Sequence, residues 1–370
     1  QPPALMRIVI AGGGTGGHLM PALAIADALR AVNPAVEPVL VGARRGIEAT
    51  LLPKRPYRHV LLSAEPLYRG AWWNNLRWPF IAWRVLRQAG QVLERERPAL
   101  VVGTGGYAAG PVLFAAHRRG LPIALQEQNA MPGLTTRLLA RWATQVHLGF
   151  PEAERHIRVR PPTRVFAHGN PISPPSTEPG RRARVRGELG IPPEAQVLLV
   201  TGGSQGSRAI NEAVARALDA GALEGMWLLW STGERHFEAQ RRFDVPPKRQ
   251  VRRFWDPIAT AYSAADLVVA RSGAMTTAEL CAYGLPSILV PFPHAAAGHL
   301  ARNAEALEQA GAAVHLPESA LNGAVLADLV QDILRRADRL AAMSRAAAGR
   351  GHPEAAERIA RQLLEEAAVK

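Results

Sequence analysis

The chain carries the same strand–glycine–helix pattern twice, and this repetition constrains its fold more than any other feature of the sequence. The first copy is "RIVIAGGGTGGHLMPALAIADAL" (7–29), and the second is "QVLLVTGGSQGSRAINEAVARAL" (196–218). In each copy a short apolar run leads into glycines, and apolar residues then recur three or four positions apart, as on one face of a helix. A strand, a glycine turn and a helix in this order are typical of a parallel α/β sheet.

Further apolar runs alternate with helical patterns through both halves of the chain. We predict the remaining strands at 38–42, 99–103, 121–126, 145–149, 226–231, 265–270 and 286–292. Between the halves, "GNPISPPSTEPGRRARVR" (169–186) is rich in proline, lacks periodicity and is predicted to be a linker. The length of 370 residues suffices for two domains. We therefore predict an α/β protein with two Rossmann-like domains, 1–172 and 173–352, and a final helix in 353–370 that packs back on the first.

The composition narrows the classes of partner and compartment. A formal net charge of +13 favours a partner that carries phosphates, although the many alanines and arginines also fit a GC-rich genome. The one cysteine, Cys281, excludes an internal disulfide and is expected to be a buried thiol in a reducing compartment. No apolar run reaches the roughly 18 residues of a membrane span, and the residues before Met6 do not resemble a signal peptide, which makes Met6 a candidate start.

Five polar turns follow predicted strands. They are "GGGTGGH" (12–18), "GTGGYAAGP" (103–111), "QEQNAMPG" (126–133), "TGGSQGSR" (201–208) and "RSGAMTTAEL" (271–280). Ligands of open parallel sheets bind where the strands end, and glycine turns before helices favour phosphate. Each turn alone is more often structural, but the five together favour a binding site.

The first turn fits the dinucleotide-binding fingerprint only in its glycines. Gly12, Gly14 and Gly17 have the required spacing, but Arg44 and Arg45 follow the second strand where an acidic residue is expected. An arginine there could contact a 2′-phosphate, so an NADP-dependent oxidoreductase remains an alternative. No Lys-Ser or Lys-Thr pair ends the turn, which argues against a P-loop.

In this order, the five turns resemble the MurG family of bacterial glycosyltransferases, glycosyltransferase family 28. The resemblance implies a GT-B fold, in which two Rossmann-like domains face each other across a cleft. It implies an inverting transfer of N-acetylglucosamine from UDP-N-acetylglucosamine to the 4-hydroxyl of lipid I, the undecaprenyl-pyrophosphoryl-N-acetylmuramoyl-pentapeptide, which gives lipid II. No cofactor is implied, and the absence of an Asp-x-Asp pair fits a metal-independent reaction.

The resemblance carries donor-binding roles to the second half of the chain. Ser204 corresponds to a contact of the donor diphosphate, and the backbone of Trp255 to a contact of the uracil edge. Glu279 corresponds to the acceptor of the ribose hydroxyls. The other members of this nucleotide-binding segment are Ala274, Met275, Thr276, Thr277 and Ala278.

The first half is implied to supply the acceptor side and the general base. His18 is the first candidate for the base, since a neutral imidazole titrates near working pH, and Glu127 is its rival. A helix-start histidine that merely bonds backbone is the structural alternative for His18. The residues implied to close on the donor are Thr15, Gly16, Gly17 and Asn129, and those implied to lie near the acceptor pyrophosphate are Gly13, Gly14, Gly105, Gly106 and Tyr107.

Three positions depart from the family pattern. Gln126 stands where many members have histidine, and Ser173 where many have an arginine that contacts the donor. Leu300 stands at the position of a glutamine that contacts the sugar, and a leucine makes no such hydrogen bond. Donor recognition is therefore expected to weaken, to move to His299 or Asn303, or to favour another sugar.

The segment "YRGAWWNNLRWPFIAWRVLRQ" (68–88) combines aromatic and basic residues in a way that suits a lipid headgroup interface. The predicted membrane-contacting residues are Trp72, Trp73, Leu76, Arg77, Phe80, Trp83 and Arg84. An amphipathic helix packed on the core is the alternative. With the resemblance, this predicts a peripheral protein of the cytoplasmic face of the inner membrane, with a role in cell shape and division and other cell-wall synthesis proteins as partners.

Other functions remain open from the sequence alone. A GT-B glycosyltransferase with another lipid acceptor, such as diacylglycerol, shares most of these motifs. A non-catalytic UDP-sugar-binding protein fits the changes at Ser173 and Leu300. No nucleic-acid-binding module is recognised, so nucleic acid is not an expected partner despite the charge.

Overall fold

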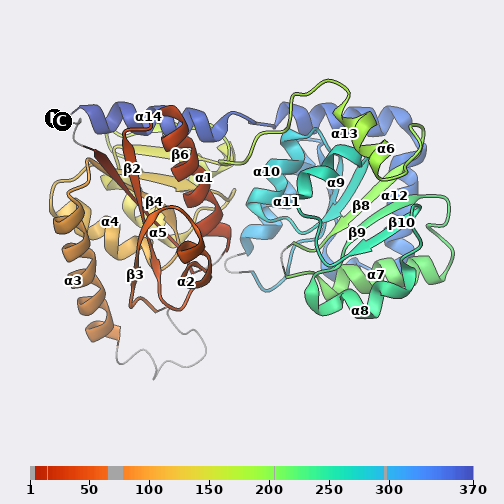
Figure 1. Ribbon diagram of the computed structural model, residues 1–370, viewed down its shortest axis with the longest axis horizontal. Helices are drawn as coiled ribbons and strands as arrows, with labels where there is room; N and C mark the ends of the chain where they lie inside the picture. Colours follow the sequence, from red (N-terminus) through yellow and green to blue (C-terminus); the bar gives the residue numbers. More distant parts are fainter. Residues whose placement is uncertain (1–4, 15, 66–77, 204, 296–297, 370) are drawn as a thin grey trace. The chain divides into compact units, whose positions relative to one another are not determined.

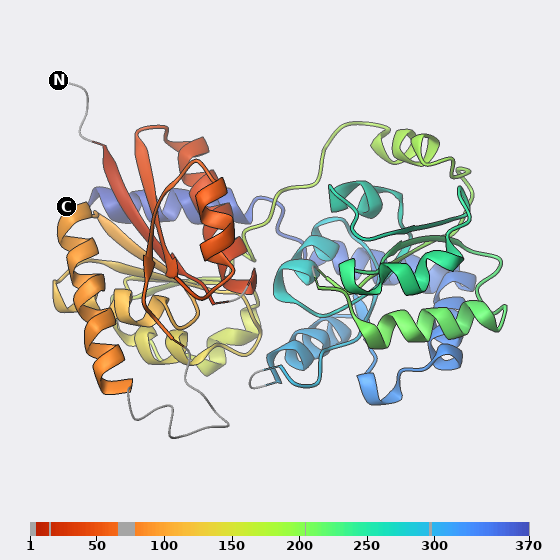
Figure 2. The same ribbon diagram turned by 60° about the horizontal axis from the view of Figure 1, so that its bottom comes forward.

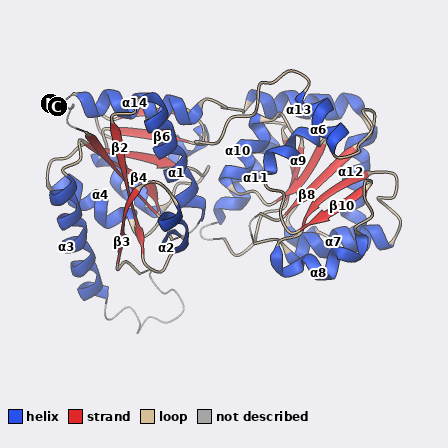
Figure 3. Ribbon diagram, viewed as in Figure 1, coloured by secondary structure: helices blue, strands red, loops and turns tan. Residues whose placement is uncertain are grey.

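The apolar runs of the sequence form the strands of two separate parallel sheets (Figure 1). The computed structural model describes residues 5–14, 16–65, 78–203, 205–295 and 298–369, without the side chain of Trp78. By their contacts the residues divide into unit 1, Gln1–Ser173 with Glu354–Lys370, and unit 2, Pro174–Pro353. Figure 3 shows that each unit consists of one sheet covered by helices.

The sheet of unit 1 has the strand order β3-β2-β1-β4-β5-β6-β7 and that of unit 2 the order β10-β9-β8-β11-β12-β13. Every strand pairing in them is parallel. The predicted class, α/β with two Rossmann-like parallel sheets, is confirmed. The strands of unit 1 are β1 (Met6–Gly12), β2 (Val36–Ala43), β3 (Arg58–Leu62), β4 (Leu100–Gly105), β5 (Ile123–Glu127), β6 (Gln145–Leu148) and β7 (Arg164–Phe166). Those of unit 2 are β8 (Val197–Thr201), β9 (Trp227–Ser231), β10 (Arg249–Arg252), β11 (Leu267–Ala270), β12 (Ser287–Leu289) and β13 (Ala313–His315).

Four of these strands were not predicted, and all four lie at sheet edges. They are β3 and β7 in unit 1 and β10 and β13 in unit 2. Each is short and contains an arginine or a histidine, because an edge strand is partly solvated. A search for apolar runs therefore finds the central strands and misses the edges.

Helices cover both faces of the sheet in unit 1. On one face, α1 (Gly16–Val32) packs against the final helix α14 (Ala355–Ala368), which buries Ile359 and Leu363 (Figures 1 and 2). On the other face lie α3 (Trp78–Glu96), α4 (Ala109–Arg118) and α5 (Leu134–Leu139). The short helix α2 (Glu48–Leu51) follows β2.

The helices of unit 2 include two that pack together over one face of its sheet, α7 (Arg208–Asp219) and α12 (Gly323–Arg335). Cys281 lies buried on α10 (Ala274–Ala282), as predicted, and burial raises the pKa of its thiol to about 11. The other helices are α6 (Arg181–Glu188), α8 (Phe237–Gln240), α9 (Ile258–Ala264), α11 (His299–Gln309) and α13 (Ala337–Gly349). No helix in the described ranges is long and apolar enough to cross a bilayer.

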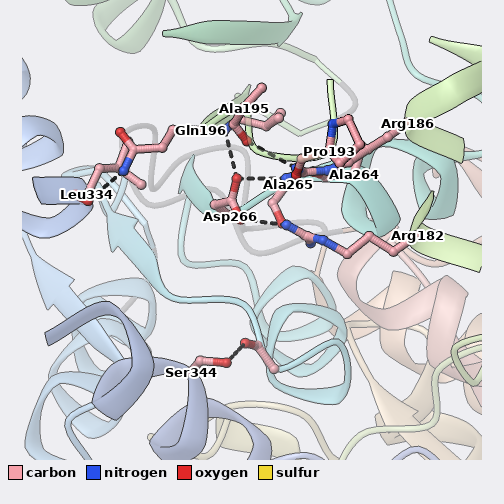
Figure 4. A network of polar contacts seen from close by, with 12 residues as sticks. Arg182, Arg186, Pro193, Ala195, Gln196, Ala264, Ala265, Asp266, Leu334 and Ser344 are labelled. Carbon is pink, nitrogen blue, oxygen red and sulfur yellow. Dashed lines mark hydrogen bonds and ion pairs between the residues drawn. The ribbon is translucent and has the colours of Figure 1, made fainter. Parts of the chain in front are cut away.

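Helix α6 corrects the predicted linker, because residues 181–186 are helical. This helix has almost no apolar face, so polar contacts fix it in place of an apolar stripe. The guanidinium of Arg186 is buried and uses Nε and both terminal nitrogens to reach the carbonyls of Ala264, Pro193 and Ala195. Its Nη2 also donates to Asp266 at 2.8 Å, and Figure 4 shows Arg182 directed at the same carboxylate.

Replacing the buried guanidinium of Arg186 by a lysine ammonium is expected to destabilise unit 2. We predict that Arg186→Lys lowers the free energy of unfolding by about 2 kcal/mol, because one ammonium cannot reach all of these acceptors and leaves buried carbonyls unpaired. Arg182→Lys is the matched control: the Arg182 side chain is 48% exposed, and the change is expected to cost at most about 0.5 kcal/mol. Urea unfolding of both variants measures the difference, and equal losses would contradict the account.

Candidate functional site

Three of the predicted turns meet at one edge of the sheet in unit 1. Strands β1, β4 and β5 are parallel neighbours, so the turns that follow them share the edge where the strands end. Two glycines of the second turn allow this approach. Gly105 has φ +98° and Gly106 φ +84°; an added Cβ would lie 2.8 Å from His18 Nδ1 at the first and 1.8 Å from the Gly13 carbonyl at the second. No larger residue fits at either position.

His18 lies in the first turn of α1, half-buried, with its ring held by the other two turns. Its Nδ1 is 3.1 Å from the carbonyl oxygen of Thr104 and 3.1 Å from Oε1 of Gln128. The hydroxyl of Thr104 in turn donates to the His18 carbonyl at 2.7 Å. The ring therefore has a fixed orientation, and both partners of Nδ1 are oxygens.

Gln128 and two further polar side chains extend this arrangement into the interior. Gln126, Gln128 and Asn170 are each at most 2% exposed. Gln126 donates to Oδ1 of Asn170 at 3.0 Å, and Asn170 donates to the Gln128 carbonyl at 2.9 Å. Sequence reasoning singled out Gln126 only as a departure and gave Gln128 and Asn170 no role.

Glu127, the other candidate base, is 3% exposed and bonded on both oxygens. Its Oε1 accepts from the backbone N–H of Asn129 at 3.1 Å and from the Asn129 side chain at 3.4 Å. Its Oε2 accepts from the N–H of Gly133 at 3.0 Å. The carboxylate thus closes the loop that carries Asn129.

Glu48 is a site residue that sequence reasoning missed. It is completely buried, and its Oε1 accepts from the N–H groups of Gly14 and Ala43, both at 2.8 Å. The N–H of Gly13 donates to the Gly105 carbonyl at 3.4 Å. The amides of Gly13 and Gly14 thus point into the protein, which corrects the expectation that this part of the turn offers them to a phosphate. The one available signal was an acidic residue inside the otherwise apolar "GIEATLLP" (46–53).

The first turn continues through Thr15, which lies outside the described residues, as does Ser204 of the second half. The next residues, Gly16 and Gly17, begin α1, and N–H groups in a first helical turn have no acceptor within the helix. Tyr107 is half-buried, and an added Cβ on Gly14 would lie 2.4 Å from its ring. Tyr107 therefore packs directly over the glycines of the first turn.

In unit 2, the two predicted donor turns follow the neighbouring strands β8 and β11. After β8, Gly203 and Gly206 have φ +79° and +75°, and Ser207 caps α7 by accepting from the N–H of Ile210. After β11, Gly273 precedes α10. Both turns therefore place a helix N-terminus at the same edge of the sheet, an arrangement that favours anionic ligands.

The segment at α10 differs in part from its predicted role. Thr277 is 1% exposed, and its hydroxyl donates to the carbonyls of Gly273 and Ala274, which argues against a direct contact of this side chain with the donor. Glu279 accepts from the hydroxyl of Tyr262 at 3.0 Å, and burial raises the pKa of its carboxyl. Ala274 is buried, and Met275, Thr276 and Ala278 are half-buried.

The remaining predicted donor residues differ in their accessibility. Trp255 is buried, with the guanidinium of Arg252 at 3.8 Å from its ring centroid. Ser173 is exposed, and His299 and Leu300 are half-buried at the start of α11. Asn303 is completely buried and its side chain donates to the Ser272 carbonyl at 3.1 Å, which argues against the alternative that it replaces a sugar contact.

The described residues contain no group of three or more histidine, cysteine, aspartate or glutamate side chains that could hold a metal ion. Two Rossmann-like sheets, each with glycine turns before helices at its carboxyl edge, are the architecture expected of a GT-B protein and favour ligands that carry phosphate.

The chain belongs to glycosyltransferase family 28: residues 8–148 match the family's N-terminal domain and residues 197–359 its C-terminal domain. It is a glycosyltransferase, and the predicted family is confirmed.

Curated relatives cover nearly the whole chain. A protein of Salinibacter ruber is 43% identical over 97% of this chain and 96% of its own length. A protein of Moorella thermoacetica is 40% identical over 97% of this chain and 98% of its own length. Both are named UDP-N-acetylglucosamine–N-acetylmuramyl-(pentapeptide) pyrophosphoryl-undecaprenol N-acetylglucosamine transferase.

Solved structures agree on the fold. The crystal structure of Acinetobacter baumannii MurG aligns with a TM-score of 0.78 at 26% identity, over 97% of this chain and 99% of that one. The calicheamicin glycosyltransferase CalG4 aligns with a TM-score of 0.68 at 17% identity, over 98% of this chain and 99% of that one, and so shows the fold alone.

Proposed function

We propose that this chain transfers N-acetylglucosamine from UDP-N-acetylglucosamine to the 4-hydroxyl of lipid I and so forms lipid II. The names of the full-length relatives support the donor and the acceptor. The observation that carries the chemistry is the position of His18 Nδ1, 3.1 Å from the Thr104 carbonyl. A backbone carbonyl only accepts, so Nδ1 holds the ring proton and Nε2 is the nitrogen that can take another.

In the proposed step, the acceptor 4-hydroxyl attacks the anomeric carbon of N-acetylglucosamine. Its proton passes to Nε2 of His18, the new bond from carbon to the acceptor oxygen forms, and the bond from carbon to the UDP oxygen breaks. The electron pair of that bond leaves with UDP, and the configuration at the carbon inverts. Glu127 is the poorer base, because both of its oxygens already accept hydrogen bonds from the loop that it closes.

We assign the donor to unit 2 and the acceptor to unit 1. Glu279 uses Oε2 for Tyr262, which leaves Oε1 for a ribose hydroxyl. We assign the diphosphate to the glycine turn between β8 and α7, because it precedes a helix N-terminus. The turn amides and helix N-termini stabilise the charge of the departing UDP. Thr15, Gly16, Gly17 and Asn129 remain the proposed residues of unit 1 that close on the donor, and Tyr107 remains a proposed contact of the acceptor.

A ligand titration separates this proposal from its rivals. UDP is expected to raise the Tm of the protein, and NADP is not; the reverse result would favour an oxidoreductase. A transfer assay with several UDP-sugars then tests whether Leu300 has changed the donor. Transfer of glucose at the rate of N-acetylglucosamine would show that this position no longer selects the sugar.

We further propose that α3 contacts an anionic membrane surface at the cytoplasmic face of the inner membrane. Ile81 and Val85 face the core, whereas Phe80 and Trp83 are 61% and 57% exposed and stack on each other. Arg87 lies 5.6 Å from the Trp83 ring centroid. Exposed aromatic rings beside arginines suit a headgroup interface. Of the predicted patch, Trp72, Trp73, Leu76 and Arg77 lie outside the described residues.

Arg84 adds a cationic side to this helix. It lines a cavity of about 190 Å³ with Arg44, Arg45 and Glu65, and its buried Nε has no hydrogen-bond partner among the described residues. Three guanidinium groups and one carboxylate give the lining of this cavity a net positive charge. A lipid phosphate beside α3 would meet that charge.

Removing the exposed aromatic pair is expected to weaken membrane binding. For the double variant Phe80→Ser and Trp83→Ser we predict at least about a tenfold loss of affinity for phosphatidylglycerol vesicles, because two large apolar side chains no longer enter the interface. Val245→Ser, at an exposed position of unit 2, is the control and should bind like the parent. Co-sedimentation with vesicles at low and high salt measures the affinity. If the double variant binds as tightly as the parent and salt does not weaken binding, the proposal is contradicted.

A further inference from the structure

The buried side chains of Gln128, Gln126 and Asn170 form a closed set of hydrogen bonds with a directional order. Gln128 Nε2 donates to Gln126 Oε1 at 2.5 Å, Gln126 Nε2 donates to Asn170 Oδ1 at 3.0 Å, and Asn170 Nδ2 donates to the Gln128 carbonyl at 2.9 Å. Each amide thus gives one bond to the next member of the set. Such a fully bonded buried network has one low-energy arrangement.

The orientation of the Gln128 amide is fixed by what surrounds its nitrogen. Nε2 has three acceptors within 2.9 Å: the carbonyls of Thr104 and Gln126 and the side-chain oxygen of Gln126. A flipped amide would place its oxygen against these three oxygens and remove the donor that they share. Oε1 of Gln128 must therefore face His18, at 3.1 Å from Nδ1.

This orientation decides which ring nitrogen of His18 carries the proton. Nδ1 faces two oxygens that only accept, Oε1 of Gln128 and the carbonyl of Thr104. A neutral ring with its proton on Nε2 would place a lone pair against both oxygens. The network therefore selects the Nδ1–H form and keeps the lone pair on Nε2.

We propose that Gln128 is a positioning residue for the transfer: through the Gln126–Asn170 network it holds His18 as the Nδ1–H tautomer, so that Nε2 receives the acceptor proton. The second part of this statement rests on the proposed function. The tautomer itself does not.

Gln126 has a defined part in this proposal. It accepts a bond from Gln128, donates to Asn170 at 3.0 Å and makes a longer bond, of 3.4 Å, to the Glu127 carbonyl. A neutral histidine, the residue of many family members at this position, also has one accepting and one donating nitrogen. Glutamine and histidine can thus both make the two bonds of the network, the one accepted from Gln128 and the one donated to Asn170, whereas an apolar residue makes neither.

The direct test is the tautomer of His18 in the unmodified protein. Nitrogen-15 NMR of protein labelled in histidine distinguishes a protonated from an unprotonated ring nitrogen, and loss of the signal in His18→Gln assigns it. We expect the proton on Nδ1 at neutral to mildly alkaline pH. A proton on Nε2 would overturn the proposal whatever the activity.

Variants then test what holds the tautomer. Gln128→Met leaves the Thr104 carbonyl as the remaining partner of Nδ1, so we expect a smaller share of the Nδ1–H tautomer. We also expect a roughly tenfold lower kcat, with the KM for UDP-N-acetylglucosamine within about twofold. Gln126→His should keep the parent tautomer and rate, and Gln126→Leu should resemble Gln128→Met. Gln145→Met is the matched control, because Gln145 is equally buried, on β6, and donates to the Gln362 carbonyl of α14.

The outcomes separate the two proposals. A lower kcat in Gln128→Met with an unchanged tautomer, or an equal loss in Gln145→Met, would show a merely structural role and overturn the assignment. If the tautomer depends on Gln128 but His18→Ala retains full turnover, the role of Gln128 at the ring stands and the assignment of the base fails.

Discussion

His18→Ala is expected to lower kcat by at least about 100-fold, the smaller end of what a positioned general base contributes. The acceptor hydroxyl is a poor nucleophile until its proton leaves, and His18 Nε2 is the proposed destination of that proton. Because the ring is not assigned to donor binding, the KM for UDP-N-acetylglucosamine should change much less than kcat. Steady-state kinetics at saturating acceptor measures both constants.

A second histidine of unit 1 supplies the control for this experiment. The Nδ1 of His59 also faces a backbone carbonyl, that of Tyr57 at 3.2 Å, but His59 lies on the edge strand β3 and outside the proposed site. His59→Ala should therefore retain normal turnover. If His18→Ala also turns over at a near-normal rate, His18 is not the base, and Glu127 becomes the candidate despite its bonded oxygens.

Glu279→Ala is expected to raise the KM for UDP-N-acetylglucosamine by about 10- to 100-fold while kcat changes by less than about threefold. Hydrogen bonds from a carboxylate to ribose hydroxyls are present in the ground state and in the transition state alike, so their loss weakens binding without raising the barrier. The magnitude is that of one or two charged hydrogen bonds. Calorimetric titration with UDP should show the same loss of affinity, and Glu212→Ala, at an exposed position on α7, should show none. An unchanged KM would remove Glu279 from the site.

The environment of Glu279 adds a pH dependence to this prediction. Burial raises the pKa of its carboxyl, so the group becomes protonated at a higher pH than an ordinary glutamate as the solution is acidified. The protonated form is a weaker hydrogen-bond acceptor, so UDP affinity should fall on acidification, beginning above the usual glutamate range. Glu279→Gln has no group that titrates there and should lose this dependence. The same profile in the parent and in Glu279→Gln would assign it to another group.

The fold was predictable where burial is complete. The central strands of both sheets are apolar on both faces, so they stand out as runs in the sequence. The edge strands and α6 do not stand out, because solvent or polar contacts such as those of Arg186 satisfy them. Family resemblance covered the site motifs but could not tell which of their side chains point inward, and so it placed Thr277, which is buried, in the nucleotide-binding segment.

The buried polar network of the site could not be predicted from the sequence, for a different reason. Gln128 lies 110 positions from His18, and Asn170 lies 44 positions from Gln126. No local pattern encodes such contacts, since they follow from the order of the strands in the sheet. Glu48 is hidden in the same way, because its bond to Gly14 joins residues 34 positions apart.

The measurement that tests the central claim most directly is transfer of labelled N-acetylglucosamine from UDP-N-acetylglucosamine to a lipid I analogue by the purified protein. We expect a β-linked disaccharide on the lipid, formed by the parent and lost by at least about 100-fold in His18→Ala. The contradicting result is UDP binding without transfer to lipid I, or transfer to diacylglycerol in its place.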